Sequence, residues 1–334
     1  MVSTVTFQDL QSEFRRLLDK EGFSAERAAL CARIFAKNTR DGVPSHGVNR
    51  FPGFVDYVRR GLVDSHAEPV LEGGHGAFER WNGRLGAGVL NAHTAMGRAI
   101  QLASQHSMGC VALRNTNHWM RAGTYGLQAA DAGCMGICWT NTKVIMPPWG
   151  SQEPKLGNNP MVLCLPRKGG HLLLDMAMSQ FSLGRLLIAE KAGEVLPVPG
   201  GFDGHGHLTT DPSEILRSKS PLPIGYWKGS GLALLLDCMA AVLSGGQATF
   251  QVGAGADETG VSQVFIAIDL ARTGCAETGE AIVESILADL QAAKPMVPAG
   301  RVAFPGERSN RLRLGSDGGG ITVDDEVWCA VKTL

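Results

Sequence analysis

The sequence predicts an α/β fold that lacks a Rossmann nucleotide-binding unit, and two observations support this. From about residue 77 onward, short apolar segments typical of buried strands alternate with segments of helical periodicity, whereas the first 60 residues carry helical periodicity alone. The glycine-rich segments also lack the Rossmann fingerprint. In Gly86-Ala87-Gly88-Val89-Leu90-Asn91, Asn91 replaces the third small residue, and the next predicted strand ends in Arg114 rather than in an acidic residue.

Composition agrees with a folded enzyme and excludes some partners. The chain has 334 residues, of which 44% are hydrophobic and 19% are charged, and its formal net charge is -1. This charge gives no electrostatic basis for binding nucleic acid or an anionic membrane. The first six residues lack the charged start and apolar core of a signal peptide. The apolar run 231–242 is too short to cross a bilayer and is interrupted by Asp237, so we expect a buried helix there.

The eight cysteines indicate a reducing compartment. None forms a Cys-x-x-Cys pair, and most lie in apolar segments, which favours buried reduced thiols over disulfides or a zinc site. We therefore expect a cytoplasmic protein. We expect no metal at His205 and His207 either, because a lone His-x-His pair in a glycine-rich loop is usually exposed and no cysteine ligand is near.

Helices are predicted first, and strands then alternate with helices. Thr6 and Asp9 form a variant of the capping box that opens the first helix, Ser24 opens the second, and residues 49–60 form the third. We then expect strands at 77–81, 109–114, 134–139, 172–175 and 264–269, helices at 91–107, 123–131 and 277–292, and a final helix from Asp325. Residues 200–223 are rich in Gly, Pro, Asp and His and are expected to form a long loop or a pair of turns.

The segment from Val43 to Pro52 holds the most informative pair of side chains. His46 can transfer a proton near neutral pH, and Arg50 can hold a carboxylate through two parallel hydrogen bonds. If residues 49–60 are helical, His46 lies at the helix entrance and Arg50 one turn further in, so both can face one cleft and serve the reduction of a 2-oxo acid. Spacing alone favours a simpler interpretation, a helix cap with a surface arginine, because His-x-x-x-Arg is a common pattern.

Several segments together resemble the type-2 malate/L-lactate dehydrogenase family. Besides Ser45-His46-Gly47-x-x-Arg50-x-Pro52 they are 115–118, 157–160, 175–179, 223–229, 305–307 and 320–325. The resemblance implies the non-Rossmann, L-sulfolactate dehydrogenase-like fold of this family, in which helices flank a mixed sheet. It implies an N-terminal helical segment at 1–75 that carries His46 and Arg50. The α/β region at 76–334 would hold the NAD-binding part near 110–270 and a C-terminal segment that packs back on the N-terminal helices. A homodimer with its active site near the subunit interface is also implied.

The resemblance further implies an activity. NADH, with NADPH not excluded, would donate hydride to the C2 carbonyl of 2,3-diketo-L-gulonate and give 3-keto-L-gulonate. His46 would be the proton donor, Arg50 the carboxylate clamp and His118 a second polar contact, and residues 119–121 favour a sugar-acid pocket. Related reductases of malate, lactate, ureidoglycolate or a cyclic imino acid are alternatives. A cofactor-free lyase or isomerase that uses His46 as a base is another.

Three segments and one histidine are expected to contact the cofactor. Asp175 ends a predicted strand and small residues follow it, which suits close approach of a dinucleotide, although helix capping would explain Asp175 as well. Lys228 at the start of an apolar helix can meet a phosphate or ribose, helped by the helix N-terminus, although an isolated lysine is usually solvated. With the family resemblance, the expected cofactor residues are His171, Asp175, Met176, Ala177, Ser179, Trp227, Lys228, Gly229, Pro305, Gly306 and Glu307.

Overall fold

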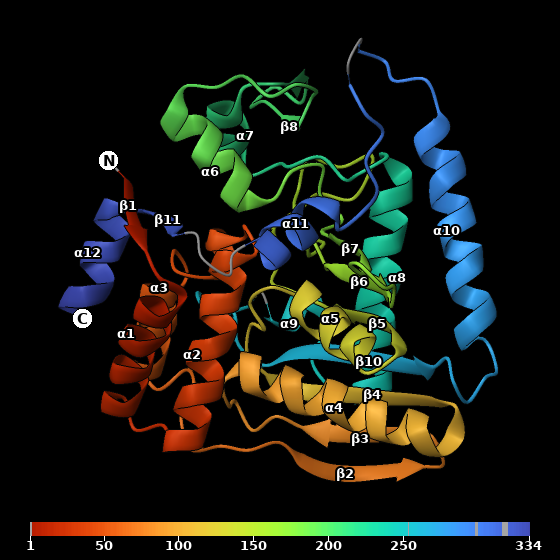
Figure 1. Ribbon diagram of the computed structural model, residues 1–334. Helices are drawn as coiled ribbons and strands as arrows, with labels where there is room; N and C mark the ends of the chain where they lie inside the picture. Colours follow the sequence, from red (N-terminus) through yellow and green to blue (C-terminus); the bar gives the residue numbers. More distant parts are fainter. Residues whose placement is uncertain (1, 253, 298–299, 316–319) are drawn as a thin grey trace.

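A seven-stranded mixed sheet forms the centre of the protein (Figure 1). The computed structural model describes residues 2–252, 254–297, 300–315 and 320–334. Within them, the sheet order is β2-β3-β4-β10-β5-β6-β7. The strands are β2 (Val70–His75), β3 (Phe78–Asn82), β4 (Met108–Thr116), β5 (Cys134–Thr140), β6 (Met161–Leu165), β7 (Leu172–Met176) and β10 (Val261–Asp269). The strands predicted from the sequence are all found, with bounds that differ by a few residues.

The pairing of the strands is unlike that of a Rossmann unit, as the sequence predicts. Among the described strands of this sheet, only β3 and β4 are parallel neighbours, and the other neighbouring pairs are antiparallel. β10 comes late in the chain and inserts between β4 and β5, pairing Phe265 with Val111 on one side and with Cys138 on the other. Its central position explains its nearly continuous apolar sequence, because such a strand is covered on both faces.

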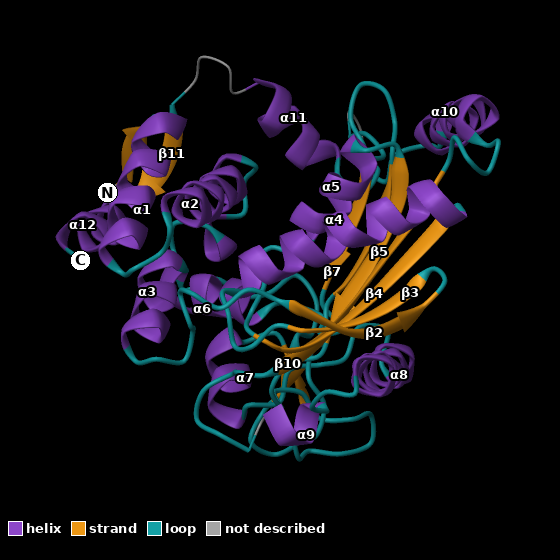
Figure 2. Ribbon diagram, turned by 90° about the horizontal axis from the view of Figure 1, so that it is seen from below, coloured by secondary structure: helices purple, strands orange, loops and turns teal. Residues whose placement is uncertain are grey.

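Helices cover both faces of the sheet (Figure 2). On one face lie α4 (Gly88–His106) and α5 (Gly123–Asp131), and the core between them and the sheet includes Trp119 and Phe265. On the other face lies α8 (Trp227–Ser244), which contacts β10, β4 and β5. The prediction of a buried helix is correct only for the inner side of α8, because Leu235, Met239 and Val242 are exposed and Val242 retains 78% of its accessible surface.

α8 is also longer than the apolar run predicted for it. It spans 18 residues and, within the described ranges, it is the helix that is long and apolar enough to cross a membrane. Ala233, Leu236 and Ala240 on its inner side nevertheless belong to the core cluster against the sheet. Packing against the sheet therefore accounts for the apolar residues on that side.

A helical layer lies beside the sheet and carries both chain termini (Figure 1). It contains α1 (Phe7–Lys20), α2 (Ala25–Arg40), a 3₁₀ helix η1 (Pro44–His46) and α3 (Phe51–Arg59). The capping box is confirmed, because Thr6 Oγ1 accepts a hydrogen bond from Asp9 N at 3.0 Å and Asp9 Oδ2 accepts one from Thr6 N at 3.0 Å. Phe14, Phe35 and Phe51 pack at the centre of this layer, where the ring centroids of Phe14 and Phe51 are 4.2 Å apart.

The first and last strands pair with each other. β1 (Val2–Val5) is antiparallel to β11 (Ile321–Asp324), with Val2 opposite Asp324 and Val5 opposite Ile321. The predicted final helix, α12 (Asp325–Thr333), follows and contacts α1 and α3. Val331 is fully buried in the same core cluster as the helices of the N-terminal layer.

Residues 200–223 hold more structure than predicted. They form the hairpin of β8 (Gly201–Phe202) and β9 (Leu208–Thr209) and the helix α7 (Pro212–Ser218), which packs on α6 (Leu183–Ala192). The prediction of a loop or turns was wrong for α7 because it overlooked a helix start. Asp211 caps α7 by accepting a hydrogen bond from Ser213 N at 2.8 Å, and Pro212 lies in the first turn, where its missing N–H is tolerated. The remaining helices are α9 (Thr249–Val252), α10 (Ala276–Ala292) and α11 (Glu307–Gly315).

The eight cysteines are free thiols, but they are not all buried as predicted. Cys31, Cys134, Cys138 and Cys164 are buried, Cys110 is half-buried, and Cys238, Cys275 and Cys329 are exposed. The exposed thiols lie on α8, on α12 and at the start of α10. Apolar neighbours in the sequence did not reveal their exposure, because in a helix adjacent residues point to different sides.

Gly88 explains one of the glycine-rich segments. It opens α4, and a Cβ atom there would overlap the backbone oxygens of Asn117 and His118. Asn91, the residue that breaks the Rossmann pattern, is buried and donates hydrogen bonds to Gly83 O at 2.9 Å and to Thr116 Oγ1 at 3.0 Å. This segment therefore holds α4 against the end of β4 and the loop that follows it.

Gly88→Ala is expected to destabilise the protein by roughly 1–3 kcal/mol, because overpacking a fixed contact costs about that much. Gly97→Ala in the same helix is the matched control, since the nearest neighbour of a Cβ at Gly97 is Gln128 Nε2 at 3.4 Å. Alanine is favoured over glycine inside a helix by about 1 kcal/mol, so Gly97→Ala should keep or raise the stability. Urea unfolding measures the difference, and equal midpoints for the two variants would show that the His118 loop moves aside without cost.

Candidate active site

The end of α2 and the turn after it position His46. Asn38 Nδ2 donates a hydrogen bond to His46 O at 2.9 Å, and Val48 N donates one to Thr39 Oγ1 at 2.9 Å. Asn38 and Thr39 are both buried, so the last turn of α2 holds the backbone at His46 and just after it. Ser45 Oγ lies 3.1 Å from His46 Nδ1. Sequence analysis missed Asn38 and Thr39, although polar residues at the end of an otherwise apolar helix face are a usable signal.

The loop between β4 and α5 positions His118. Met120 N donates a hydrogen bond to His118 Nδ1 at 3.0 Å, so Nδ1 is an acceptor and the neutral ring carries its proton on Nε2. Asn117 anchors the loop by donating to Leu85 O at 2.8 Å. Asn115 and Met120 have φ angles of 53° and 63°. Such strained backbone in non-glycine residues is often found beside functional side chains.

His46 and His118 face each other as stacked rings. Their ring centroids are 5.8 Å apart and their planes differ by 12°. Burial lowers the pKa of His46 to about 3, with further lowering by His118, Arg50 and Arg121. Burial and the charge of Arg50 lower the pKa of His118 to about 3 as well. Both rings are therefore neutral near pH 7, when His118 offers an Nε2–H donor and His46 can accept a proton.

Arg50 lies near the two imidazoles with its charge available. α3 begins at Phe51 and Arg50 is its N-cap residue, so the prediction that Arg50 lies one turn inside the helix was wrong. Pro52 lacks a backbone N–H and is tolerated in the first turn of a helix, which fits this start. The side chain of Arg50 is exposed and makes no hydrogen bond or ion pair with any residue of the described ranges. Such a guanidinium can bind a carboxylate through two parallel bonds.

A buried ion pair joins the two segments that carry the histidines. Arg121 Nη1 lies 2.8 Å from Asp41 Oδ2, and the two side chains are only 3% and 5% exposed. A second tie runs nearby, where Thr124 Oγ1 donates to Asn38 Oδ1 at 2.8 Å. The end of α2 and the beginning of α5 are thus fixed to each other at two points.

The three residues after His118, which favour a sugar-acid substrate in the sequence, have buried side chains. Trp119 is 1% exposed and packs against Tyr125 and Phe265, and Arg121 is held by Asp41. A large aromatic side chain gains more from burial in the sheet core than from lining a polar cleft. These residues instead support the loop that carries His118.

Glu258 is a charged residue near Arg50 that sequence analysis missed. It is buried, and its Oε2 accepts a hydrogen bond from Lys143 N at 3.0 Å. Burial raises the pKa of the Glu258 carboxyl, while the Lys143 N–H and the charges of Arg50 and Lys143 act in the opposite direction. No motif surrounds Glu258 in the sequence, and only its packing places it here.

Two predicted cofactor segments lie side by side at the end of β7. Ile224 N donates to Met178 O at 2.8 Å, so residues 176–180 run along the segment before α8. Asp175 Oδ2 accepts a hydrogen bond from Gly123 N at 2.8 Å and so caps α5, which was the alternative interpretation of this residue. The side chain of Asp175 is exposed, but desolvation by the surrounding protein still raises its pKa. The hydrogen bond from Gly123 N and the charge of Arg121 act in the opposite direction.

Lys228 is an available cation at the start of α8. Its Nζ lies 6.0 Å from the centroid of the Trp227 ring, and it makes no hydrogen bond or ion pair with the part of the chain that the structure describes. The helix N-terminus is less available than predicted. Lys228 N donates to Gly225 O at 3.2 Å, and Gly229 N donates to Ile224 O at 2.9 Å. A phosphate here would meet the side chain of Lys228 rather than these two amides.

The third predicted segment, 305–307, meets the other end of β7. Leu173 N donates to Pro305 O at 3.1 Å. His171, just before β7, places its Nε2 2.9 Å from Asp131 Oδ1. All three predicted cofactor segments therefore adjoin one strand of five residues, whose length is about 17 Å at a rise of roughly 3.3 Å per residue.

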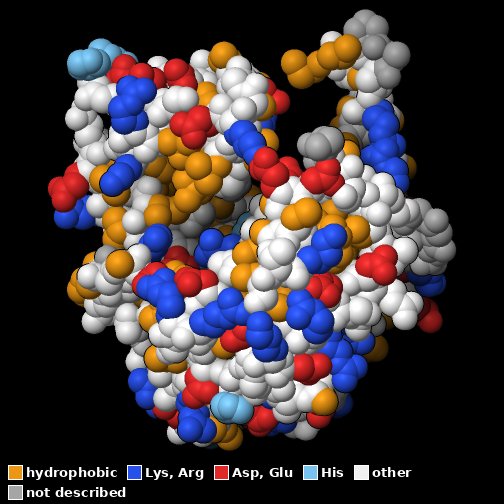
Figure 3. Space-filling model, turned by 90° about the vertical axis from the view of Figure 1, so that its left-hand side faces the viewer, with side chains coloured by type: hydrophobic (Ala, Val, Ile, Leu, Met, Phe, Trp, Pro, Cys, Tyr) orange, Lys and Arg blue, Asp and Glu red, His pale blue; other side chains and the backbone are white. Residues whose placement is uncertain are grey.

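The surface of the N-terminal side carries charges of both signs. On the face shown in Figure 3, Lys and Arg are interspersed with Asp and Glu, and apolar side chains line a hollow. His205 and His207 are exposed. Within the described residues, no group of three or more His, Cys, Asp or Glu is arranged to hold a metal ion.

Comparison with known sequences identifies the family. A family model for malate/L-lactate dehydrogenase matches residues 5–332. The chain is similar to 2,3-diketo-L-gulonate reductases of Citrobacter koseri and Klebsiella pneumoniae, with 44% identity over 331 residues and 99% of each chain covered.

Solved structures agree with this assignment. The chain is similar to sulfolactate dehydrogenase from Methanocaldococcus jannaschii, with a TM-score of 0.91 and 28% identity over 99% of this chain and 96% of that chain. It is similar to delta1-piperideine-2-carboxylate reductase from Pseudomonas syringae, with a TM-score of 0.86 and 28% identity over 99% of both chains. The predicted α/β fold with a mixed sheet flanked by helices is thereby confirmed. The chain is an oxidoreductase that belongs to the malate/L-lactate dehydrogenase family.

Proposed function

We propose that the protein reduces the C2 carbonyl of 2,3-diketo-L-gulonate to give 3-keto-L-gulonate. The observation that carries this proposal is the stacked, neutral pair of His46 and His118 near the available charge of Arg50. The 44% identity to 2,3-diketo-L-gulonate reductases over nearly the whole chain supports the choice of substrate. When bound, NADH supplies a hydride to C2, and the protein supplies one proton to the oxygen, so that the hydroxy acid and NAD⁺ are formed.

Each of the three side chains has one task. Arg50 binds the carboxylate at two points and so fixes the position of C2. His118 donates its Nε2–H to the C2 oxygen and stabilises the negative charge that develops there. His46 gives a proton to the same oxygen as the C–O double bond is lost.

Substrate binding prepares His46 for this task. In the protein without substrate, burial and then the charges of His118, Arg50 and Arg121 keep the pKa of His46 low. A carboxylate on Arg50 neutralises one of these charges and brings a negative charge close to the ring. Both effects raise the pKa of His46, so the ring takes up the proton that the reduction consumes. In the oxidative direction the neutral ring accepts the hydroxyl proton directly.

The residues around β7 fit a nicotinamide dinucleotide. Lys228 provides a cation for a phosphate through a charge-assisted hydrogen bond. Ala177 and Gly306 are small and allow the backbone to approach a ligand closely. With His171 and the remaining residues of 175–179, 227–229 and 305–307 they form the proposed contacts, and NADH is the proposed cofactor, with NADPH as the alternative.

Other 2-oxo acids are the main alternative substrates. Similarity to a sulfolactate dehydrogenase and to a piperideine carboxylate reductase, each at 28% identity, keeps malate, lactate, ureidoglycolate and cyclic imino acids in consideration. Membership of a dehydrogenase family argues against the cofactor-free lyase or isomerase. Assays of these acids with NADH and with NADPH test the proposal. The highest kcat/KM should belong to 2,3-diketo-L-gulonate with NADH, and a higher value for another acid would replace this substrate.

We also propose that the protein is a cytoplasmic homodimer. Apolar side chains are left uncovered on α10 and on the outer side of α8, and they include Ile282, Ile286, Leu235, Met239 and Val242. Patches of this kind usually mark a contact surface, and a second copy is the partner that the family resemblance implies. Sedimentation equilibrium would give the mass of a dimer, and the free thiols fit a reducing compartment.

His46→Ala is expected to lower turnover by about a hundred- to ten-thousand-fold, which is the usual contribution of general acid catalysis. NADH binding, followed by nicotinamide fluorescence, should be unchanged. The control is His106→Ala, which removes an exposed histidine at the end of α4. Near-normal turnover in His46→Ala would transfer the role of proton donor to His118.

Arg50→Lys is expected to weaken substrate binding and turnover together while NADH binding stays the same. Lysine keeps the charge but loses the planar group that holds a carboxylate at two points, so C2 swings away from its reacting position. Steady-state kinetics and NADH titration measure the two effects. Arg59→Lys is the control, because Arg59 is the last residue of α3, the helix that Arg50 caps, and pairs with Glu21. Normal reduction with weakened NADH binding would place Arg50 at the cofactor phosphates instead.

Lys228→Ala is expected to raise the KM for NADH about ten-fold or more, because a charge-assisted hydrogen bond to a phosphate is lost. The KM for the keto acid should change little. Lys332→Ala is the matched control, because Lys332 also lies over a tryptophan ring, at 5.8 Å from the centroid of Trp328, but in the terminal helix. An unchanged KM for NADH would mean that Lys228 is simply solvated.

A further inference from the structure

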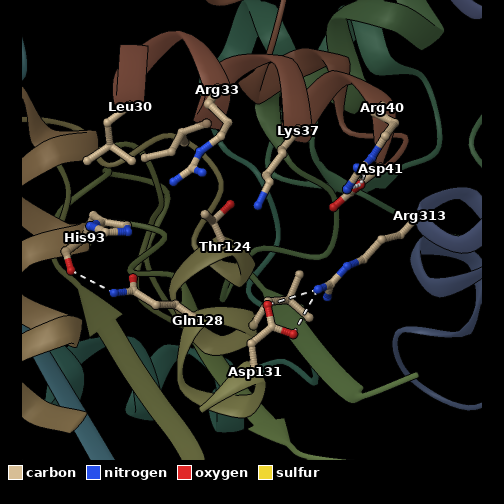
Figure 4. Close-up of a pocket in the computed structure, with 12 residues that line it drawn as sticks. Leu30, Arg33, Lys37, Arg40, Asp41, His93, Thr124, Gln128, Asp131 and Arg313 are labelled. Carbon is tan, nitrogen blue, oxygen red and sulfur yellow. Dashed lines mark hydrogen bonds and ion pairs between the residues drawn. The ribbon is translucent and has the colours of Figure 1, made fainter. Parts of the chain in front are cut away.

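A pocket outside the proposed active site gathers positive charge. It lies between α2, α4, α5 and α11 and has a cavity volume of about 160 Å³ (Figure 4). Two carboxylates, Asp41 and Asp131, face the same space. The cations that line it are Arg33, Lys37, Arg40 and Arg313.

Both carboxylates are already engaged by other groups. Asp41 Oδ1 lies 2.8 Å from Arg40 Nη2, and Asp41 Oδ2 lies 2.8 Å from the buried Arg121. Asp131 Oδ1 lies 2.9 Å from His171 Nε2 and 2.9 Å from Arg313 Nη2. Each carboxylate thus has two cationic or hydrogen-bonding partners, four in all, and little of the negative charge is left for the remaining cations of the pocket.

Lys37 and Arg33 carry the charge that is not compensated. Neither side chain makes a hydrogen bond or ion pair with any residue in the described ranges. In Figure 4 the amino group of Lys37 points into the pocket, with Arg33 on one side and Arg313 on the other. Burial lowers the pKa of Lys37, and Arg33, Arg40 and Arg313 lower it further against the opposite effect of Asp131. The electrostatic potential in the pocket is therefore positive, and a bound anion would reduce the repulsion between its cations.

We propose that this pocket binds a phosphate group. Cations from α2 and from α11 can contact different oxygens of one tetrahedral dianion, and guanidinium and ammonium groups form strong charge-assisted bonds to phosphate. The volume limits the size of the ligand. Pockets that enclose whole drug-sized ligands measure about 300–1,000 Å³, so a cavity of about 160 Å³ takes a single phosphate group and not an entire dinucleotide.

The phosphate group has two possible sources. One is free phosphate or a small phosphorylated metabolite. The other is the 2′-phosphate of NADPH, because His171, a proposed cofactor contact, is bonded to Asp131 on the pocket wall. Only the assignment to the 2′-phosphate of NADPH rests on the proposed function. The pocket also adjoins the turn that carries His46. Lys37 precedes Asn38, and the side chain of Asn38 donates a hydrogen bond to the backbone oxygen of His46.

Calorimetry with inorganic phosphate, at constant ionic strength set with sodium chloride, tests the site without any turnover. The wild-type protein should bind phosphate, and Lys37→Gln and Arg33→Gln should each weaken the binding about ten-fold or more, as expected for loss of a hydrogen bond between charged groups. Lys294→Gln removes an exposed lysine after α10 and should bind like the wild type. Equal Tm values of all variants in chloride show that they are folded. Absence of binding to the wild type, or equal affinity in Lys37→Gln and Lys294→Gln, would overturn the proposal.

Titration of phosphate in the presence of each cofactor distinguishes the sources. If the 2′-phosphate of NADPH fills the pocket, NADPH should displace phosphate, NADH should not, and Lys37→Gln should weaken NADPH binding alone. If the ligand is a separate phosphate, it should bind equally well beside either cofactor. Displacement by NADH and NADPH alike would assign the pocket to the shared part of the cofactor and overturn the proposal of a further site.

Discussion

The buried ion pair between Asp41 and Arg121 joins two distant chain segments that must meet for His46 and His118 to face each other. Taking two charges out of water is costly, and the cost is offset only when each charge has further hydrogen bonds. Here Asp41 also binds Arg40, and Arg121 Nη2 donates to Ser309 Oγ at 3.2 Å. Loss of one partner would leave a buried charge uncompensated, at a cost of about 3–5 kcal/mol. The contact of α2 with the His118 loop is therefore a condition for folding and for the site at once.

The resulting site contains two neutral imidazoles and two cationic side chains that can bind anionic ligands. The side chains of Arg50 and Lys228 make no hydrogen bond or ion pair within the described residues, and burial keeps His46 and His118 uncharged. The same burial affects the whole fold. Since the pKa of His46 falls from 6.5 to about 3 on folding, the unfolded chain binds more protons than the folded one between these pH values. The free energy of unfolding contributed by this residue therefore decreases as the pH falls through that range.

Sequence patterns within a single segment predicted the elements whose formation depends on neighbouring residues, such as capped helices and apolar strands. The capping box of Thr6 and Asp9 and the apolar run of β10 each mark one element, and both elements were found. The place of β10 between β4 and β5 was not predictable, because strands far apart in sequence pair through long-range packing. The candidate site shows the same division. Resemblance pointed to residues 46–50 and to His118, whereas Asp41 and Glu258 reach the site only through tertiary contacts. The burial of Trp119 against Phe265 was not predictable either, because a motif does not reveal which side of a loop a residue faces.

The pairing of β1 with β11 has a consequence for the time at which the enzyme can form. The helical layer that carries His46 and Arg50 completes its core with residues from the last strand and helix, including Val331. A ribosome adds roughly 5–20 residues per second, so a chain of 334 residues takes about 17–67 s to make. Through most of that interval the N-terminal helices have been synthesised but lack part of their core. The layer that carries His46 can therefore complete its core only after β11 and Val331 have been synthesised, and until then its uncovered apolar side chains favour aggregation.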